Sequence, residues 1–298
     1  MSKILITGAS GLVGTRLTQL LLEKGHEVSH LGRTKKSGGV KSFVWDVKKG
    51  TIDPEALQNI DAVIHLAGSG IADERWTKER KQDILESRTK STALLVQKLN
   101  EGNNSIKTLV SASAIGYYGM TLDAKEFTEA SQPGEGFLAD VVTAWEHEAD
   151  QVKNKRLVKI RIGVVLSKND GALKEIAKPI RWGVGAPLGT GKQYVSWVHL
   201  DDLCGIFIKA VEDESMLGAY NATAGSVTNR ELTKAIAKTL HKPLWLPAIP
   251  GFALKLVLGE MADLVLYGSN VSSNKIKQAG FTFKYNTLEK ALNNLLAH

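Results

Sequence analysis

The sequence predicts an α/β fold, a Rossmann-type doubly wound parallel sheet with a smaller C-terminal α/β lobe. Short apolar runs alternate with helical patterns in the first half of the chain, a glycine-rich turn follows the first run, and the pattern loosens after about residue 165. Strand–helix alternation of this kind is typical of a parallel sheet covered on both faces. A chain of 298 residues is long enough for one such domain with an added lobe.

The expected elements follow from the spacing of apolar residues. Five buried strands are expected at Lys3–Thr7, Glu27–Leu31, Phe43–Asp46, Ala62–Leu66 and Thr108–Ala112. Helices are expected at Leu12–Lys24, Lys78–Asn100 and Gly136–Lys153, with one more strand at Leu157–Val165. In the second half of the chain we expect a strand at Tyr194–His199, helices at Asp202–Glu212, Asn229–Leu240 and Thr287–Leu296, and a buried helix at Phe252–Leu266.

Composition excludes several classes of protein. The chain has no apolar stretch of 18 residues and no signal-peptide pattern at its start, so we expect a cytoplasmic protein with no membrane partner. Its one cysteine, Cys204, excludes an internal disulfide and fits a core position. The net charge is +7, but the 38 basic residues are scattered, which disfavours nucleic acid. The sequence has no pair of His or Cys residues at metal-ligand spacing, so we expect no metal site.

A glycine-rich turn follows the first expected strand. Between Thr7 and Gly14 the spacing is Gly-x-x-Gly-x-x-Gly, directly before an amphipathic helix. Such a turn lets the backbone approach a pyrophosphate, and the helix start offers N–H groups and a favourable dipole. We expect cofactor contacts from Thr7, Gly8, Ser10, Gly11, Leu12, Val13 and Gly14.

The residue after the second strand indicates which dinucleotide binds. An NAD site would place Asp or Glu there, on the ribose 2′-hydroxyl. This chain has Arg33, whose guanidinium can bind a 2′-phosphate with two N–H groups. Lys35 and Lys36 either add charge or are ordinary surface lysines. We therefore expect an NADP(H)-binding domain at 1–165, re-entered near 195–225, and a mainly substrate-binding lobe at 166–298.

Several motifs extend this interpretation. The glycine turn, the stretch Asp61–Gly68 and the strand ending Ser111-Ala112-Ser113 resemble the extended short-chain dehydrogenase/reductase superfamily. The match narrows to an atypical group, the nucleoside-diphosphate-sugar epimerase-like proteins with their own C-terminal domain. The narrower motifs are Arg75-Trp76, Ser87-Arg88, Ile115–Gly119, Trp145-Glu146, Arg161–Leu166, Pro187–Gly191, Trp197–Asp202, Tyr220–Ala222, Gly259–Met261 and Gly280–Phe283.

The resemblance covers essentially the whole chain. It implies a Rossmann domain that binds NADP(H) and a C-terminal substrate lobe, without naming a reaction. It further implies that the cofactor contacts Asp46, Leu66, Ala67, Gly68, Arg88, Ser111, Ala112, Ile162, Gly163 and Val164.

The catalytic residues of the superfamily are only partly present. Standard members use a Ser or Thr after the fifth strand and Tyr-x-x-x-Lys on the next helix, where the lysine lowers the tyrosine pKa. Ser113 suits the first role, but Phe137 and Val141 stand roughly at the Tyr and Lys positions and neither can move a proton. The candidates for an acid or base that replaces this pair are Tyr117, Tyr118, Lys81, Glu146 and Asp140.

Each of these candidates also has a structural interpretation. Either tyrosine could pack under the loop, and Trp145-Glu146 could be a core anchor with a surface or capping carboxylate. Arg75, Trp76, Lys81 and Arg88 suit an anionic or planar ligand, or a helix face paired with nearby glutamates. Trp197 and His199 are substrate candidates, although His199 could cap the next helix.

Two functions therefore remain open. The first is an NADP(H)-dependent oxidoreductase or epimerase, monomeric or homodimeric, acting on a polar small molecule such as a nucleotide sugar or a carbonyl compound. In that role Ser113 would orient the reacting oxygen. The second is a non-catalytic protein that senses NADP(H) and presents a surface to a partner. The intact glycine turn suits both. The missing Tyr-x-x-x-Lys favours the second, whereas Ser113 and the polar segment Arg75–Arg88 favour the first, which we prefer.

Overall fold

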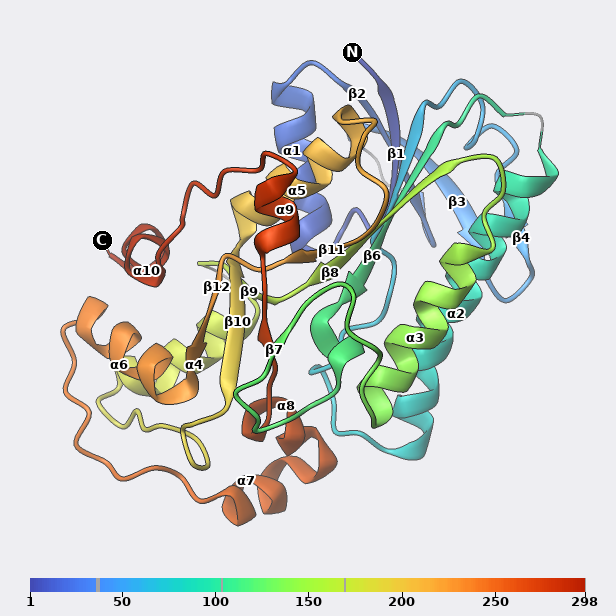
Figure 1. Cartoon of the computed structure of the whole chain (residues 1–298). Helices are drawn as coiled ribbons and strands as arrows, with labels where there is room; N and C mark the ends of the chain where they lie inside the picture. The colour runs from blue at the N-terminus through green and yellow to red at the C-terminus, as the bar shows by residue number, and fades with distance from the viewer. Residues whose placement is uncertain (36–37, 103, 169, 298) are drawn as a thin grey trace.

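The computed structural model describes residues 1–35, 38–102, 104–168 and 170–297. Its largest sheet has eight strands: β1 (Lys3–Thr7), β2 (Glu27–Gly32), β3 (Lys41–Asp46), β4 (Thr51–Ile52), β5 (Ala62–His65), β6 (Thr108–Ala114), β8 (Arg156–Ile162) and β11 (Gly218–Ala222). Their order is β11–β8–β6–β5–β1–β2–β3–β4 (Figure 1). Every neighbouring pair is parallel except β3–β4. The carboxyl ends of seven strands therefore meet at one edge of the sheet.

Helices cover both faces of this sheet. On one face α1 (Leu12–Glu23) packs against α5 (Leu200–Glu212), and on the other α2 (Lys78–Glu101) packs against α3 (Phe137–Asp150) (Figure 1). The first face buries Leu17, Leu21 and Phe207, and the second buries Leu95 and Leu99. Cys204 is also buried, within α5. The predicted doubly wound fold is confirmed.

A smaller lobe follows the large sheet. It holds a three-stranded sheet in the order β12 (Gly225–Thr228), β10 (Tyr194–His199), β9 (Val164–Leu166), and the pair β13 (Asn270–Val271) with β7 (Glu126–Phe127). Its helices are α4 (Ala172–Arg181), α6 (Asn229–Thr239), α7 (Gly251–Leu258), α8 (Asp263–Leu266), α9 (Asn274–Gln278) and α10 (Leu288–Leu296). Two 3₁₀ turns complete the described elements, η1 (Ile115–Tyr118) and η2 (Gly259–Ala262). No helix within the described ranges is both long and apolar enough to cross a membrane.

The strand expected at Leu157–Val165 is two strands in the structure. The chain leaves the large sheet after Ile162 and pairs with β10 from Val164 onward. Gly163 lies at the crossing between the two sheets. A Cβ there would lie 2.5 Å from the carbonyl oxygen of Ser196, so the close approach of the backbones requires glycine. Apolar spacing continues through the crossing, so the pattern gave no sign of the change of sheet.

The prediction of one buried helix at Phe252–Leu266 is wrong. The segment forms α7, η2 and α8, and none of the residues of α7 is buried. Phe252 is 78% exposed and Leu256 is 81% exposed. The helix is short because Gly259, with φ of +62°, ends it after eight residues. An apolar sequence predicted burial, but α7 contacts η2 with only part of its surface and leaves Phe252 and Leu256 exposed.

Candidate cofactor-binding and active site

The glycine-rich turn lies between β1 and α1, at the carboxyl edge of the large sheet. Gly8 has a φ of +68°, and a Cβ there would lie 2.7 Å from the carbonyl carbon of Leu66. A Cβ on Gly14 would lie 2.5 Å from the carbonyl oxygen of Gly8. A side chain at either position would push the turn away from its neighbours, so both positions require glycine.

The start of α1 suits an anion. Its N-cap is Gly11, which has no side chain to bond the first N–H groups, and its first turn holds no acidic residue. Leu12 and Val13 begin the helix, and Ser10 is exposed beside it. Backbone N–H groups and the positive end of the helix dipole stabilise bound phosphate at such a terminus. These residues fit the pyrophosphate of a dinucleotide.

Arg33 lies next to this turn. β1 and β2 are parallel neighbours with Thr7 opposite Leu31, so the residues that follow them share one edge of the sheet. Arg33 is exposed and makes no ion pair with any described residue. No carboxylate stands between Gly32 and Lys35. The charge and position fit a 2′-phosphate, while Lys36 lies outside the described residues.

Asp46 ends β3, two strands away from β1. Its carboxylate accepts the backbone N–H groups of Lys48 and Lys49, both at 3.0 Å. The side chain therefore holds the turn between β3 and β4. A contact to the cofactor would use the second carboxylate oxygen, which lies 3.8 Å from the ammonium of Lys49.

The loop Leu66–Gly68 faces the glycine turn, and Arg88 supports it from α2. Arg88 donates to the carbonyl oxygens of Ser69 and Ile84, both at 3.0 Å. Its guanidinium also lies 5.4 Å from the ring centre of Trp145. Burial lowers the pKa of Arg88 to about 10, and no carboxylate pairs with it in the described part of the chain. A cation buried in this way favours an anionic ligand close to the loop.

Ser113 belongs to a buried network of charged side chains at the end of β6. Its hydroxyl donates to the Glu146 carboxylate at 2.6 Å, and only 2% of Ser113 is exposed. Arg161, beside Ser113 in the neighbouring strand β8, donates to both oxygens of the same carboxylate at 2.8 and 2.9 Å. Burial acts to raise the pKa of Glu146, but Arg161 and Ser113 outweigh it and hold the pKa below its ordinary range.

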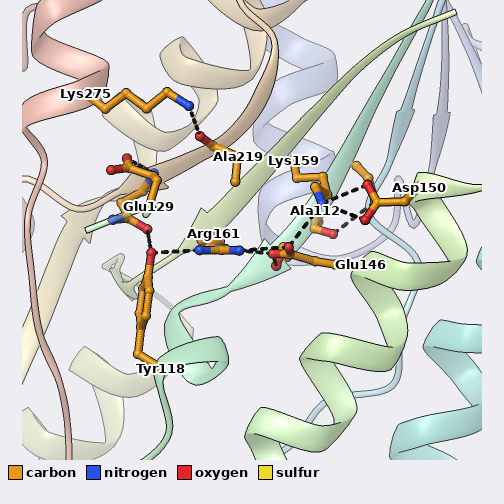
Figure 2. A network of polar contacts seen from close by, with 12 residues as sticks. Ala112, Tyr118, Glu129, Glu146, Asp150, Lys159, Arg161, Ala219 and Lys275 are labelled. Carbon is orange, nitrogen blue, oxygen red and sulfur yellow. Dashed lines mark hydrogen bonds and ion pairs between the residues drawn. The ribbon is translucent and has the colours of Figure 1, made fainter. Parts of the chain in front are cut away.

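Figure 2 shows how the network extends on both sides of Arg161. Toward α3, Lys159 lies 3.3 Å from Glu146 and 2.8 Å from Asp150. Toward η1, Arg161 donates to the Tyr118 hydroxyl at 3.0 Å, and that hydroxyl donates to Asn221 at 2.6 Å. The earlier alternative of a surface or capping carboxylate at Glu146 is therefore wrong. Glu146 is instead the buried counter-ion of Arg161, whose charge would have no carboxylate partner in the described residues if Glu146 lay at the surface.

The two tyrosines of η1 differ in their surroundings. Tyr118 is 2% exposed, and burial raises its pKa. Tyr117 is half-buried, its ring lies 3.4 Å from the guanidinium carbon of Arg161, and its hydroxyl has no hydrogen-bond partner among the described residues. Tyr118 thus completes the network, whereas the Tyr117 hydroxyl is free to meet a ligand.

Helix α3 has neither a hydroxyl nor an amine where the superfamily places its Tyr and Lys. Phe137 packs edge-on against Trp76 with ring centres 5.0 Å apart, and Val141 is buried. Asp140 is exposed in the first turn of the helix. The usual proton-transfer pair is therefore absent from this helix.

A cavity of about 390 Å³ lies between the start of α3 and the segment η2–α8. Lys81 borders it and forms an ion pair with Glu260 across it. Arg75 lies outside it and donates to the backbone carbonyl of Val257. In the described residues neither Arg75 nor Lys81 pairs with the neighbouring glutamates of the 74–86 segment. The lining residues are Trp76, Lys81, Gly119, Met120, Glu135, Gly136, Phe137, Leu138, Ala139, Glu260, Asp263 and Tyr267.

Trp197 and His199 lie inside the smaller sheet, and both are buried. His199 accepts the N–H of Asp201 at 3.0 Å, so it caps α5, and its ring stacks on Tyr285 at 3.7 Å. Its second nitrogen lies 3.1 Å from the Asn294 side-chain oxygen. Capping and packing occupy the whole imidazole.

The remaining expected cofactor residues lie along the carboxyl edge of the sheet. Ser111 and Ala112 are buried within β6, directly before Ser113. Ile162 ends β8, and Gly163 and Val164 carry the chain into β9. They line the same edge as the glycine turn, two and three strands away from β1 in the order of the sheet.

Sequence reasoning missed Arg161 as a partner of Glu146, and it missed Glu135, Glu260, Asp263 and Tyr267 at the cavity. One signal was available for Arg161. A charged residue between Ile160 and Ile162 in a central strand needs a buried partner, and Glu146 stood on the preceding helix.

Residues 4–222 match the model of the NAD dependent epimerase/dehydratase family. The chain belongs to this family. Residues 249–295 match a further model, a domain of unknown function, DUF1731. The resemblance drawn from the sequence motifs is thereby confirmed, including the separate C-terminal domain.

Similar members of the epimerase family extend over the same length. The chain is 37% identical over 300 residues to the epimerase family protein YfhF of Bacillus subtilis (strain 168), covering 99% of this chain and 98% of that protein. It is 38% identical to the chloroplastic SDR39U1 homolog of Arabidopsis thaliana, covering 96% and 84% respectively. A crystal structure of human epimerase family protein SDR39U1 (isoform 2) with NADPH has 31% identity and a TM-score of 0.90, covering 98% of each chain.

Proposed function

We propose that this member of the epimerase family binds NADP(H) and acts as an oxidoreductase or epimerase on a polar small molecule. The observation that carries the proposal is Arg33, exposed and unpaired among the described residues beside the glycine turn, with no carboxylate near it. A carboxylate at this position would repel a 2′-phosphate, whereas a guanidinium binds it. The human relative with NADPH, at 31% identity, supports the same cofactor.

The residues fit such a cofactor along one edge of the sheet. The turn Thr7–Gly14 would hold the pyrophosphate, and Arg33 the 2′-phosphate. Leu66–Gly68, supported by Arg88, would close over the ribose, and Ile162–Val164 would border the nicotinamide. NADP(H) supplies or accepts a hydride at carbon when bound.

The hydrogen bonds of Ser113 limit its role in such a reaction. Its proton is donated to the ionised Glu146, so its oxygen can accept a hydrogen bond but has no proton for a carbonyl oxygen. Ser113 would therefore orient a substrate hydroxyl. Of the other candidates, Tyr118 is bound to Asn221, and Lys81 is paired with Glu260. Tyr117 is the favoured proton donor, because its hydroxyl is free and its ring rests on Arg161.

The second function, a non-catalytic sensor of NADP(H), is supported by two observations. Helix α3 carries Phe137 and Val141 near the positions of the usual Tyr and Lys, and Ser113 is engaged with Glu146. A protein of this kind would bind the cofactor at the same edge and leave the substrate unchanged.

Calorimetric titration with NADPH and NADH tests the cofactor. We expect NADPH to bind at least about tenfold more tightly, a difference of about 1.4 kcal/mol, and Arg33→Ala to abolish the preference. Arg181→Ala is the control, because this exposed arginine ends α4 in the smaller lobe. Equal binding of the two cofactors, or an unchanged preference in Arg33→Ala, would refute the assignment of Arg33.

Turnover separates the two functions. Reduction of a panel of carbonyl compounds is followed as NADPH oxidation, using native protein, Tyr117→Phe and Ser113→Ala. Epimerisation of a panel of nucleotide sugars is followed by chromatography of the sugars, because an epimerase returns the hydride to its substrate and leaves no net change in the cofactor. For an enzyme, Tyr117→Phe should lower kcat by about 10²-fold or more at unchanged NADPH affinity, as expected for a lost general acid. NADPH binding without turnover across the panel would favour the sensor.

A further inference from the structure

The cavity beside α3 has an acidic lining. Its charged residues are three carboxylates, Glu135, Glu260 and Asp263, and one ammonium, Lys81. Lys81 is already neutralised by its ion pair with Glu260. Asp263 has the Lys255 ammonium 3.7 Å away, so Glu135 is the lining carboxylate without a cation among the described residues, and the charge left for a ligand is negative. Diphosphate groups, which carry negative charge themselves, would be repelled from such a site.

The same cavity has aromatic walls. Trp76, Phe137 and Tyr267 contribute to its lining, with Trp76 set edge-on to Phe137. The indole N–H of Trp76 donates to the carbonyl oxygen of Ile71 at 2.8 Å, so the ring offers apolar and π surface rather than a donor. Phe137 already has the Lys81 ammonium 5.2 Å from its ring centre. Aromatic faces beside carboxylates attract organic cations and flat rings.

Asp263 is a second carboxylate of the lining, and a cation lies close to it. Its Oδ1 atom is shielded from solvent and has no hydrogen-bond partner in the described part of the chain. The nearest cation is the ammonium of Lys255 at 3.7 Å, which is too long for a hydrogen bond. The two groups still form an ion pair, so Asp263 is partly neutralised, and Glu135 is the carboxylate whose charge is available to a ligand.

We propose that this cavity binds the non-reacting part of the substrate, and that this part is a flat or quaternary organic cation rather than the diphosphate of a nucleotide sugar. The inference rests on the proposed function, because it treats the cavity as the substrate side of the same cleft. Gly119, which lines the cavity, follows η1 directly and is two residues after Tyr117. The aromatic walls would hold the ring, and Glu135 would hold the charge.

Two small probes of opposite charge test this inference. The full-length chain is titrated calorimetrically with benzyltrimethylammonium chloride and with phenyl phosphate, each with and without saturating NADPH. We expect the cation to bind and phenyl phosphate not to bind. We also expect NADPH to leave the affinity for the cation intact, because the glycine turn and the cavity are separate segments.

Variants assign the binding to the cavity. Asp263→Asn and Glu135→Gln should each weaken cation binding by about fivefold or more, as expected for the loss of one nearby charge. Glu135 is exposed, so its variant should fold normally even if Asp263→Asn is less stable. The control is Glu79→Gln, an exposed carboxylate of α2 that does not line the cavity.

The outcomes separate this inference from the proposed function. Phenyl phosphate binding that depends on Lys81, or cation binding unaffected by both variants, would overturn the inference. NADPH binding without cation binding would overturn the inference and leave the proposed function standing. Cation binding without NADPH binding would overturn the proposed function, and with it the identification of the cation as substrate.

Discussion

Arg161 and Glu146 form a two-point ion pair inside the protein, with nitrogen–oxygen distances of 2.8 and 2.9 Å. Both side chains are buried, one on β8 and the other on α3. The helix that lacks the usual Tyr and Lys of its superfamily is thus tied to the sheet by charge. The pair also fixes Ser113 and Tyr118, which each bond to one of its members.

Removing one partner of this pair should be strongly destabilising. Glu146→Gln leaves the Arg161 charge buried without compensation, and we expect the free energy of unfolding to fall by about 3–5 kcal/mol. Urea denaturation followed by circular dichroism measures the change. Glu148→Gln, on the same helix without an ion pair to any described residue, should change it by less than about 0.5 kcal/mol. Equal stability of the two variants would show that the pair contributes little.

Gly8 and Gly25 offer a matched test of the glycine turn. Both have positive φ, +68° and +81°, but a Cβ on Gly8 would meet Leu66 whereas one on Gly25 would meet nothing within 4 Å. Gly25→Ala should cost about 1–2 kcal/mol of stability through backbone strain alone and leave the NADPH Kd unchanged. In Gly8→Ala the same strain applies, and the new Cβ should also displace the turn. We therefore expect the Kd for NADPH to rise about tenfold or more. Similar NADPH affinities in both variants would contradict this role for the turn.

The large sheet was predictable because its inner strands are short runs of buried residues. All residues of β5, Ala62–His65, are buried, so its apolar run stands out. β11 was not named as a strand, although the chain was expected to re-enter the domain near 195–225, because Gly218 and Asn221 interrupt its apolar character. Asn221 is buried with its side chain bonded to Tyr118 and Ser272. Burial of a polar residue depends on partners that the local sequence does not show.

In the candidate site, too, one part can be predicted from the local sequence and another part cannot. The glycine turn follows from local spacing, because its function depends on the backbone of consecutive residues. The cavity depends on tertiary packing: Glu260 reaches Lys81 from 179 residues farther along the chain. Arg161 lies in an alternating run of basic and apolar residues that is typical of a half-exposed strand. Only the packing of α3 against β8 gives it a buried partner.

Helix α7 was expected to be buried but is exposed, and this difference can be tested by stability measurements. Leu256 is 81% exposed, so Leu256→Gln should change the free energy of unfolding by less than about 0.5 kcal/mol. Leu95→Ala on α2, at a completely buried position, should cost about 2–5 kcal/mol because it leaves a cavity. Both values come from urea denaturation. A large loss in Leu256→Gln would mean that α7 is covered in solution, for example by a second molecule.

His65 should make stability depend on pH. It is completely buried in β5, with its ring nitrogens 2.7 Å from the Thr7 hydroxyl and 2.9 Å from the Thr92 hydroxyl. Burial lowers the pKa of His65 to about 4, whereas an unfolded histidine titrates near 6.5. Between these values the unfolded chain binds a proton that the folded protein does not. The stability that neutral His65 contributes is therefore present above about pH 6.5 and is lost as the pH falls toward 4.

The slope of stability against pH isolates this histidine. Urea denaturation at several pH values between 7 and 4.5 should show a loss from His65 approaching roughly 1 kcal/mol per pH unit. His65→Gln should be less stable at pH 7, because it alters the bonds to Thr7 and Thr92, yet its slope should be shallower by that amount. His147→Gln, at an exposed position of α3, should keep the native slope. If His65→Gln also kept the native slope, the pH dependence would have to come from other groups, and His65 would titrate alike in the folded and unfolded states.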